Sequence, residues 1–249
     1  ELMALMVGGF ATIAGGVMAA YAGMGIDPAH LVSASVISAP AALLISKLMI
    51  PETEESPTMG HVEITIDEKH ANVVDAATSG ALEGLKLTLN VAAMLIAFLG
   101  LVALIDAALG LVGGWVGGLF GYSWTWSLST IFGYIFFPFA WLLGIPYADC
   151  IYAGELLGKK MVLNEFIAYA QMMAWQQPDS GVVLSERSIL ILTYALCGFA
   201  NFGSVGIQIG GIGGIAPDRK ADLARLGMRA MIGGTLAMMM TACIAGILI

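Results

Sequence analysis

The segment GFATIAGG, at residues 9–16, interrupts a long apolar run with small and polar residues. A second segment, GFANFGSV at residues 198–205, matches it, and each continues into a glycine-spaced tail. Glycine and small residues let a helix unwind inside a membrane, where the freed backbone groups must bond an ion, a substrate or water. The pair therefore predicts two discontinuous helices. Close helix packing through small residues is the alternative, but it does not require the polar Thr12, Asn201 and Ser204 at the interruptions.

The remainder of the chain is apolar as well. Hydrophobic residues make up 59% of the 249, against 10 basic and 18 acidic residues, which is too little charge for a soluble domain. Charge-free runs near or above the ~20 residues that span a bilayer cover 2–26, 28–46, 87–105, 107–148, 188–217 and 230–249. The sequence thus predicts an all-α polytopic membrane protein.

Its net charge of −8 offers no basic surface to nucleic acid. We expect Cys150, Cys197 and Cys243 to be buried thiols.

The loop at residues 218–229 sets the orientation. It carries four basic side chains (Arg219, Lys220, Arg225 and Arg229), which place it in the cytoplasm by the positive-inside rule. Counting spans back from this loop, the helix with residues 9–16 runs outward and the helix with residues 198–205 runs inward. The two matching segments then form an inverted repeat, which is the best sequence pointer to the binding site of a secondary transporter.

Five stretches follow from these patterns. We expect a first unwound helix and the next helix over 1–50, a cytoplasmic loop and an interfacial helix over 51–86, and a scaffold helix with an interfacial or re-entrant segment over 87–146. A re-entrant hairpin over 147–175 and a second unwound helix with a final transmembrane helix over 188–249 complete the chain. We expect glycines, among them Gly113, Gly114, Gly117 and Gly118, to interrupt the stretch at 107–148.

Glu165 is the leading functional candidate because it lies in an apolar stretch. A carboxylate near the bilayer centre costs about 2.5–3.5 kcal/mol on insertion scales, so it needs a partner or a wet cavity. The alternative is a shallow hairpin from which Glu165 reaches the headgroups. Asp106, Asp149 and Glu155 are weaker candidates, since each lies near the end of a segment where a carboxylate is solvated. The three histidines, His30, His61 and His70, have no metal-ligand spacing, and no serine-histidine-acid arrangement or nucleotide loop is present.

Five motifs resemble the concentrative nucleoside transporters. They are GFATIAGGV (9–17), SAPAAL (38–43), PETE (51–54), LNEF (163–166) and ALCGFANF (195–202), and the likeness runs through the whole chain in order. The chain is most similar to a bacterial, sodium-coupled member. The resemblance implies a homotrimer in the bacterial inner membrane, with a scaffold and an elevator-type transport domain that moves against it. It also implies an amino-terminal part, with the family's first hairpin, before Glu1.

The same resemblance implies roles for seven residues. Glu165, Asn201 and Ser204 match the positions that hold the ribose, Phe199 an aromatic position beside the site, and Val17 the nucleobase end. Thr12 and Ile13 match the sodium site, through a hydroxyl and a backbone carbonyl. This chain has Thr12 where the family often has serine, which keeps the hydroxyl.

We therefore expect a secondary active transporter, not an enzyme, that imports uridine-like nucleosides by sodium symport with alternating access. One alternative is proton coupling with Glu165 as the titrating group. Two others are a channel, and an intramembrane enzyme that uses Glu165 or Asp149, although the sequence offers such an enzyme no second catalytic group.

Overall fold

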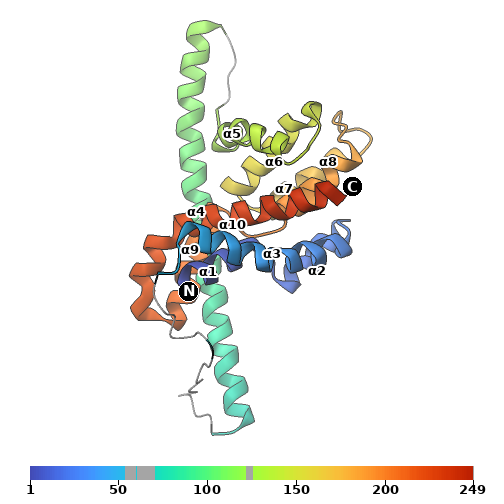
Figure 1. Cartoon of the computed structure of the whole chain (residues 1–249). Coiled ribbons are helices and arrows are strands. Elements are labelled where there is room, and N and C mark those ends of the chain that lie inside the picture. Colours follow the sequence, from blue (N-terminus) through green and yellow to red (C-terminus); the bar gives the residue numbers. More distant parts are fainter. Residues whose placement is uncertain (54–59, 61–70, 122–125, 249) are drawn as a thin grey trace.

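A computed structural model describes residues 1–53, 60, 71–121 and 126–248 of the chain. All regular structure in these ranges is helical, as the apolar runs predict (Figure 1). The α-helices are α1 (Leu2–Ala11), α2 (Gly15–Gly23), α3 (Pro28–Met49), α4 (Val73–Phe120), α5 (Leu128–Leu142), α6 (Cys150–Val162), α7 (Glu165–Trp175), α8 (Glu186–Leu196), α9 (Phe202–Ile215) and α10 (Lys220–Leu248). Most of the acidic loop after α3, with His61 and His70, lies outside the described residues.

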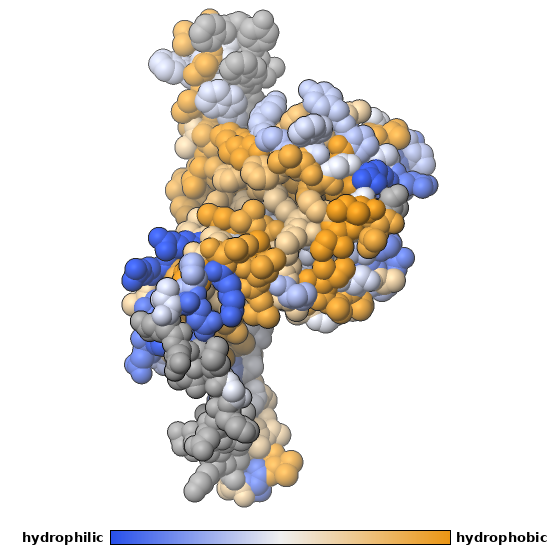
Figure 2. All heavy atoms as spheres, in the orientation of Figure 1, coloured by the Kyte–Doolittle hydropathy of each residue, from blue (hydrophilic) through white to orange (hydrophobic). Residues whose placement is uncertain are grey.

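Within the described ranges, four helical stretches are long and apolar enough to cross a membrane. They are the broken helix Leu2–Gly23, then Pro28–Met49, Val73–Leu119 and Pro217–Leu248. Figure 2 shows that hydrophobic side chains cover much of the visible face of the helical body. Val36, Leu48 and Leu104, for example, are each about two-thirds exposed. Apolar surface of this extent suits contact with lipid better than contact with water.

Both discontinuous helices that the matching segments predict are present. The first is interrupted at residues 12–14, between α1 and α2, and the second at residues 197–201, between α8 and α9. The second break touches the last turn of α1, directly before the first break, because a Cβ added to Gly198 would lie 2.9 Å from the Phe10 carbonyl oxygen. Gly198 therefore serves close packing as well as unwinding, so both explanations of the glycines apply at this position.

The helix α4 differs from its prediction. It runs unbroken for 48 residues and contains Gly113, Gly114, Gly117 and Gly118, so these glycines do not interrupt it. The separate interfacial helix expected at 73–86 is likewise the first part of α4. At 1.5 Å per residue α4 is about 70 Å long, more than twice the roughly 30 Å hydrocarbon core, and Figure 1 shows it extending past the bundle at both ends. A helix bonds its own backbone throughout, so glycine alone does not end it where leucine and valine favour continuation.

The helices α6 and α7 form the helical hairpin expected at 147–175. They are 13 and 11 residues long, joined by Leu163 and Asn164. Each is shorter than the ~20 residues that a complete span needs, so the hairpin has the dimensions of a re-entrant element. Its depth in a membrane stays a prediction.

The hairpin packs on α5 through glycines. A Cβ on Gly158 of α6 would lie 2.6 Å from the Gly133 nitrogen and 2.7 Å from the Ser129 carbonyl oxygen, both in the backbone of α5. Because these neighbours are backbone atoms, they cannot move aside as a flexible side chain would. This close approach fixes the hairpin against α5.

We therefore expect Gly158→Ala to destabilise the protein by about 1–3 kcal/mol, the usual cost of overpacking a well-packed contact. The measurement is the thermal unfolding midpoint of the full-length protein in detergent. Gly80→Ala is the matched control, since a Cβ there meets nothing within 4 Å. Equal midpoints for the two variants would contradict the close contact.

Candidate functional site

Glu165 is the first residue of α7, directly after the hairpin connection, and its side chain is only 5% exposed. The hydroxyl of Tyr21, on α2, donates a hydrogen bond to Oε1 at 2.8 Å. The amide Nδ2 of Asn201, in the second break, donates to Oε2 at 3.3 Å. One buried carboxylate thus joins the hairpin to both discontinuous helices.

Asn201 is held in place by its own helix. It is the N-cap of α9, and its Oδ1 accepts a hydrogen bond from the Ser204 backbone N–H at 2.8 Å. Because the amide oxygen is used for the cap, the NH₂ group is the end that faces Glu165. Capping therefore does two things, since it satisfies the start of α9 and aims a donor at the carboxylate.

Glu165 lines a cavity of about 590 Å³ between the hairpin, both discontinuous helices and α4. Its size is within the range of small-molecule sites, and its lining is apolar apart from a few convergent polar groups. All five residues expected to hold the nucleoside line this cavity, namely Val17, Glu165, Phe199, Asn201 and Ser204. Residues far apart in the chain therefore meet around one space.

The two residues expected at the sodium site lie apart from this cavity lining, at the first break. Thr12 is the C-cap residue of α1. Its hydroxyl donates to the Gly8 carbonyl at 2.9 Å, which leaves the lone pairs of the hydroxyl oxygen available to a cation. Ile13 is 9% exposed. The carbonyl end of a helix carries a partial negative charge, so the end of α1 suits a cation held by neutral oxygens. The described residues contain no group of three or more acidic, histidine or cysteine side chains that could hold a metal ion.

Sequence reasoning missed Tyr21 and Gln208. Tyr21 is fully buried, and its ring lies 4.8 Å from that of Tyr169. It follows Val17 by four residues on one helix face, which was an available signal. Gln208 follows Ser204 by four residues in the same way and lines the cavity. Its Nε2 donates to the Met6 carbonyl at 3.1 Å, while its Oε1 is buried without a partner among the described residues.

The weaker carboxylate candidates hold the fold together. Asp149 accepts three hydrogen bonds from the start of α8: from the Ser185 N–H at 3.1 Å, the Ser185 hydroxyl at 2.8 Å and the Ser188 hydroxyl at 2.6 Å. Asp106 accepts from the Leu128 N–H at 2.6 Å, which links α4 to α5. None of these contacts faces the cavity.

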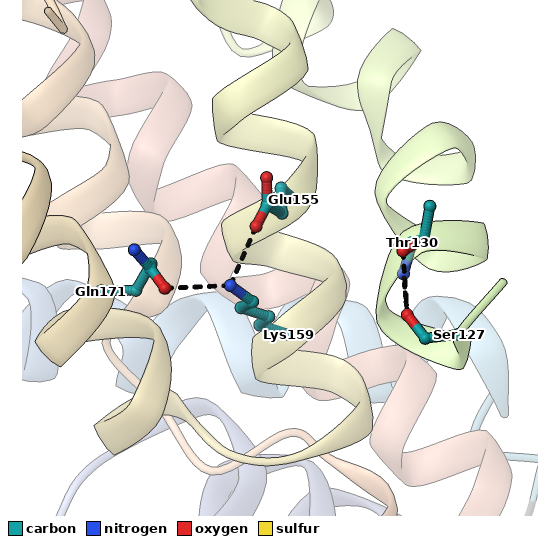
Figure 3. A network of polar contacts seen from close by, with 5 residues as sticks. All are labelled: Ser127, Thr130, Glu155, Lys159 and Gln171. Atoms are coloured by element: carbon teal, nitrogen blue, oxygen red, sulfur yellow. Dashed lines mark hydrogen bonds and ion pairs between the residues drawn. The ribbon is translucent and has the colours of Figure 1, made fainter. Parts of the chain in front are cut away.

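Glu155 belongs to a brace within the hairpin, shown in Figure 3. The Lys159 ammonium donates to the Glu155 carboxylate at 2.9 Å and to the Gln171 side-chain oxygen at 3.0 Å, so it connects α6 with α7. Figure 3 also shows Ser127 and Thr130, whose hydroxyls lie 2.8 Å apart at the start of α5.

Cys150 and Cys197 are buried free thiols and Cys243 is partly buried.

Comparison with known proteins decides the family. The chain matches the model of "Na+ dependent nucleoside transporter C-terminus" over residues 30–246. The chain belongs to the concentrative nucleoside transporters. This confirms the resemblance carried by the sequence motifs.

Relatives match the whole chain but are longer than it. An uncharacterized transporter of Haemophilus influenzae is 52% identical and is covered over 58% of its length. Solute carrier family 28 member 3 of Eptatretus stoutii is 46% identical, with 37% of its length covered, and sodium/nucleoside cotransporter 1 of Mus musculus is 41% identical, with 39% covered. The chain thus spans between about a third and three-fifths of the length of these relatives.

Solved structures of a family member, CNTnw, share the fold. An inward-facing, substrate-bound structure is 43% identical, with a TM-score of 0.78 over 98% of this chain and 56% of that one. A variant in its "intermediate 3" state is also 43% identical and has a TM-score of 0.86 over 99% of this chain and 58% of that one. The arrangement of the broken helices and the hairpin is therefore placed within the fold of a known transporter.

The contact between Tyr21 and Glu165 makes a prediction about stability. Tyr21→Phe removes the hydroxyl and leaves the buried carboxylate one donor short, so a double-mutant cycle with Glu165→Gln should give a coupling free energy of about 1–3 kcal/mol. The measurement is thermal or denaturant unfolding of the full-length protein in detergent. Tyr169→Phe is the control, because the Tyr169 hydroxyl donates to the Thr193 carbonyl instead. Coupling no larger than that of the control would contradict the contact.

Proposed function

We propose that the full-length protein imports nucleosides, uridine-like ones among them, by sodium symport with alternating access. The observation that carries this proposal is the buried Glu165 carboxylate, which faces a cavity between two broken helices and is held by one donor from each. The sodium-dependent family model and the sodium/nucleoside cotransporter among the relatives support the coupling.

The chemistry of the cavity suits a neutral but strongly polar substrate. A carboxylate has about four acceptor sites, and Tyr21 and Asn201 bond one oxygen each, so acceptor capacity remains for the hydroxyls of a ribose. Asn201 and Ser204 add groups that both donate and accept, and Val17 and Phe199 supply apolar surface for the base. In this proposal the sugar lies toward Glu165 and the base toward Val17.

Sodium enters the proposal as a co-transported substrate at the first break. The Thr12 hydroxyl and the Ile13 carbonyl hold it there, as oxygen ligands suit a hard cation. An ion that orders this break raises nucleoside affinity, and by linkage the nucleoside raises sodium affinity equally. The gradient of one then drives the other.

Movement and assembly follow from the same proposal. The hairpin α6–α7 and the two broken helices move together against α4, as the elevator arrangement requires, and the long exposed face of α4 serves the contacts of a homotrimer. The bacterial relatives support an inner-membrane location.

Glu165 is also the group through which protons would couple, because it is a buried carboxylate beside the cavity. Uptake that follows a pH gradient and is indifferent to sodium would favour proton coupling.

The substrate role of Glu165 is tested by Glu165→Gln in proteoliposomes that contain the full-length protein. A hydrogen bond to a charged group contributes about 1.5–3 kcal/mol, so apparent affinity for labelled uridine should fall roughly tenfold to a hundredfold. Glu155→Gln is the matched control, because Glu155 bonds Lys159 in the hairpin brace and should leave uptake unchanged. Wild-type affinity in a folded Glu165→Gln protein would refute the site.

The sodium role of Thr12 is tested by removing its hydroxyl. Thr12→Val keeps the shape of the side chain, so we expect the sodium concentration for half-maximal uridine uptake to rise at least about fivefold, from the loss of one ligand. Thr12→Ser keeps the hydroxyl and should stay near wild type. If the valine and serine variants share the wild-type sodium dependence, Thr12 is no sodium ligand.

A further inference from the structure

Lys160 is a buried lysine that the proposed transport cycle does not use. It lies in the last turn of α6, five residues before Glu165, and is only 4% exposed. Its ammonium donates to the Ala195 carbonyl at 2.9 Å and contacts the Met238 sulfur at 2.8 Å. Taking an ammonium out of water is costly unless its surroundings compensate, so the burial of Lys160 has to be explained by the groups around it.

The break between α8 and α9 explains why a lysine is buried here. Ala195 is in the last turn of α8, and in a continuous helix its carbonyl would accept a hydrogen bond from the N–H of residue 199. Because α8 ends at Leu196, residue 199 lies in the break instead. Lys160 supplies the donor that the break removes. It also places a positive charge at the carbonyl end of α8, where the helix dipole favours a cation.

A glycine makes room for this arrangement. A Cβ added to Gly198 would collide with the sulfur of Met238, the second partner of the ammonium. The Ala195 carbonyl and the Met238 sulfur therefore form a binding site for a positive group. Helices α6, α8 and α10 enclose this site, and the Lys160 ammonium occupies it.

The first break is built differently. In the alignment of the two matching segments, Ala195 corresponds to Met6. The Met6 carbonyl accepts from the neutral amide of Gln208 at 3.1 Å, and the nearby Gly8 carbonyl accepts from the neutral hydroxyl of Thr12 at 2.9 Å. One broken helix thus ends against a lysine side chain, and its counterpart ends against the uncharged side chains of Gln208 and Thr12.

We propose that the Lys160 ammonium is a resident cation that supplies, at the break between α8 and α9, the positive charge that a sodium ion supplies at the break between α1 and α2. The second break then needs no ion from solution, and sodium binds at the first break alone. The sodium part of this inference rests on the proposed function, whereas the role of the ammonium at the second break does not.

The test is chemical rescue of Lys160→Ala in the full-length protein. This variant opens a space the length of a propyl chain beside the Ala195 carbonyl, so propylammonium ions at millimolar concentration should fill it, and propanol is the neutral probe of the same length. We expect uridine uptake to fall at least tenfold and to recover severalfold with propylammonium but not with propanol. Lys160→Met, which fills the space, should not respond to the amine.

A second readout follows the sodium dependence of uptake. If the ammonium occupies an ion position, its removal in Lys160→Ala lets sodium enter, so the Hill coefficient for sodium should rise from about 1 towards 2. Lys160→Gln keeps a hydrogen-bond donor without the charge, and we expect it to stay impaired. Lys159→Met is the control for the neighbouring lysine, whose bonds lie in the hairpin brace, and it should keep wild-type uptake and sodium dependence.

Three results of the uptake experiments would overturn the inference. Equal rescue by propylammonium and propanol would reduce Lys160 to a space-filling side chain. Wild-type behaviour of Lys160→Gln would show that the hydrogen bond suffices without the charge, and wild-type behaviour of Lys160→Met would show that neither matters.

A readout without transport separates this inference from the proposed function. Propylammonium, but not propanol, should raise the thermal unfolding midpoint of purified Lys160→Ala protein. If the wild type shows no sodium-dependent nucleoside uptake, the proposed function fails while this midpoint still decides the role of the ammonium. If the midpoint is unmoved by the amine, the resident cation fails whatever the wild type transports.

Discussion

The structure depends on one constraint: a helix broken inside an apolar body must find partners for the backbone groups that the break releases. The two breaks meet this constraint with side chains from elsewhere in the chain or from their own helix ends. Asn201 caps α9, Thr12 bonds the last turn of α1, and Lys160 bonds the last turn of α8. With these partners in place, Phe199 and Asn201 of the second break form part of the cavity wall.

The same partners create the electrostatics of the site. The side-chain oxygen of Asn201 accepts the hydrogen bond that caps α9, so its NH₂ group is the part that can donate to Glu165. Tyr21 completes the support of the carboxylate from the other broken helix. The hairpin, whose tip carries Glu165, is in turn fixed by glycine contacts with α5 and by Asp149, which directly precedes α6 and bonds the start of α8. Asn201 is therefore both a cavity residue and a cap residue, which couples the stability of the second break to the shape of the site.

Local patterns anticipated many of these features. The glycine and polar residues of the matching segments predicted both discontinuous helices, and the lone carboxylate in an apolar stretch pointed to Glu165. The prediction failed at α4, where glycines in an apolar run were read as interruptions. The breaks at residues 12–14 and 197–201 have polar side chains that bond nearby backbone or side-chain groups, whereas the glycines of α4 lie among apolar residues and remain helical. Glycine permits a break but does not by itself produce one.

The sequence alone determined the class of the protein, the positions of its broken helices and the family to which it belongs, because these depend on periodicity, charge count and short motifs. Only the tertiary structure decided which side chains share the cavity and which groups satisfy the breaks. Tyr21 and Glu165 are 144 residues apart, and the carbonyl bonded by Lys160 lies 35 residues from it. Contacts of this kind arise when helices pack, so no local pattern contains them.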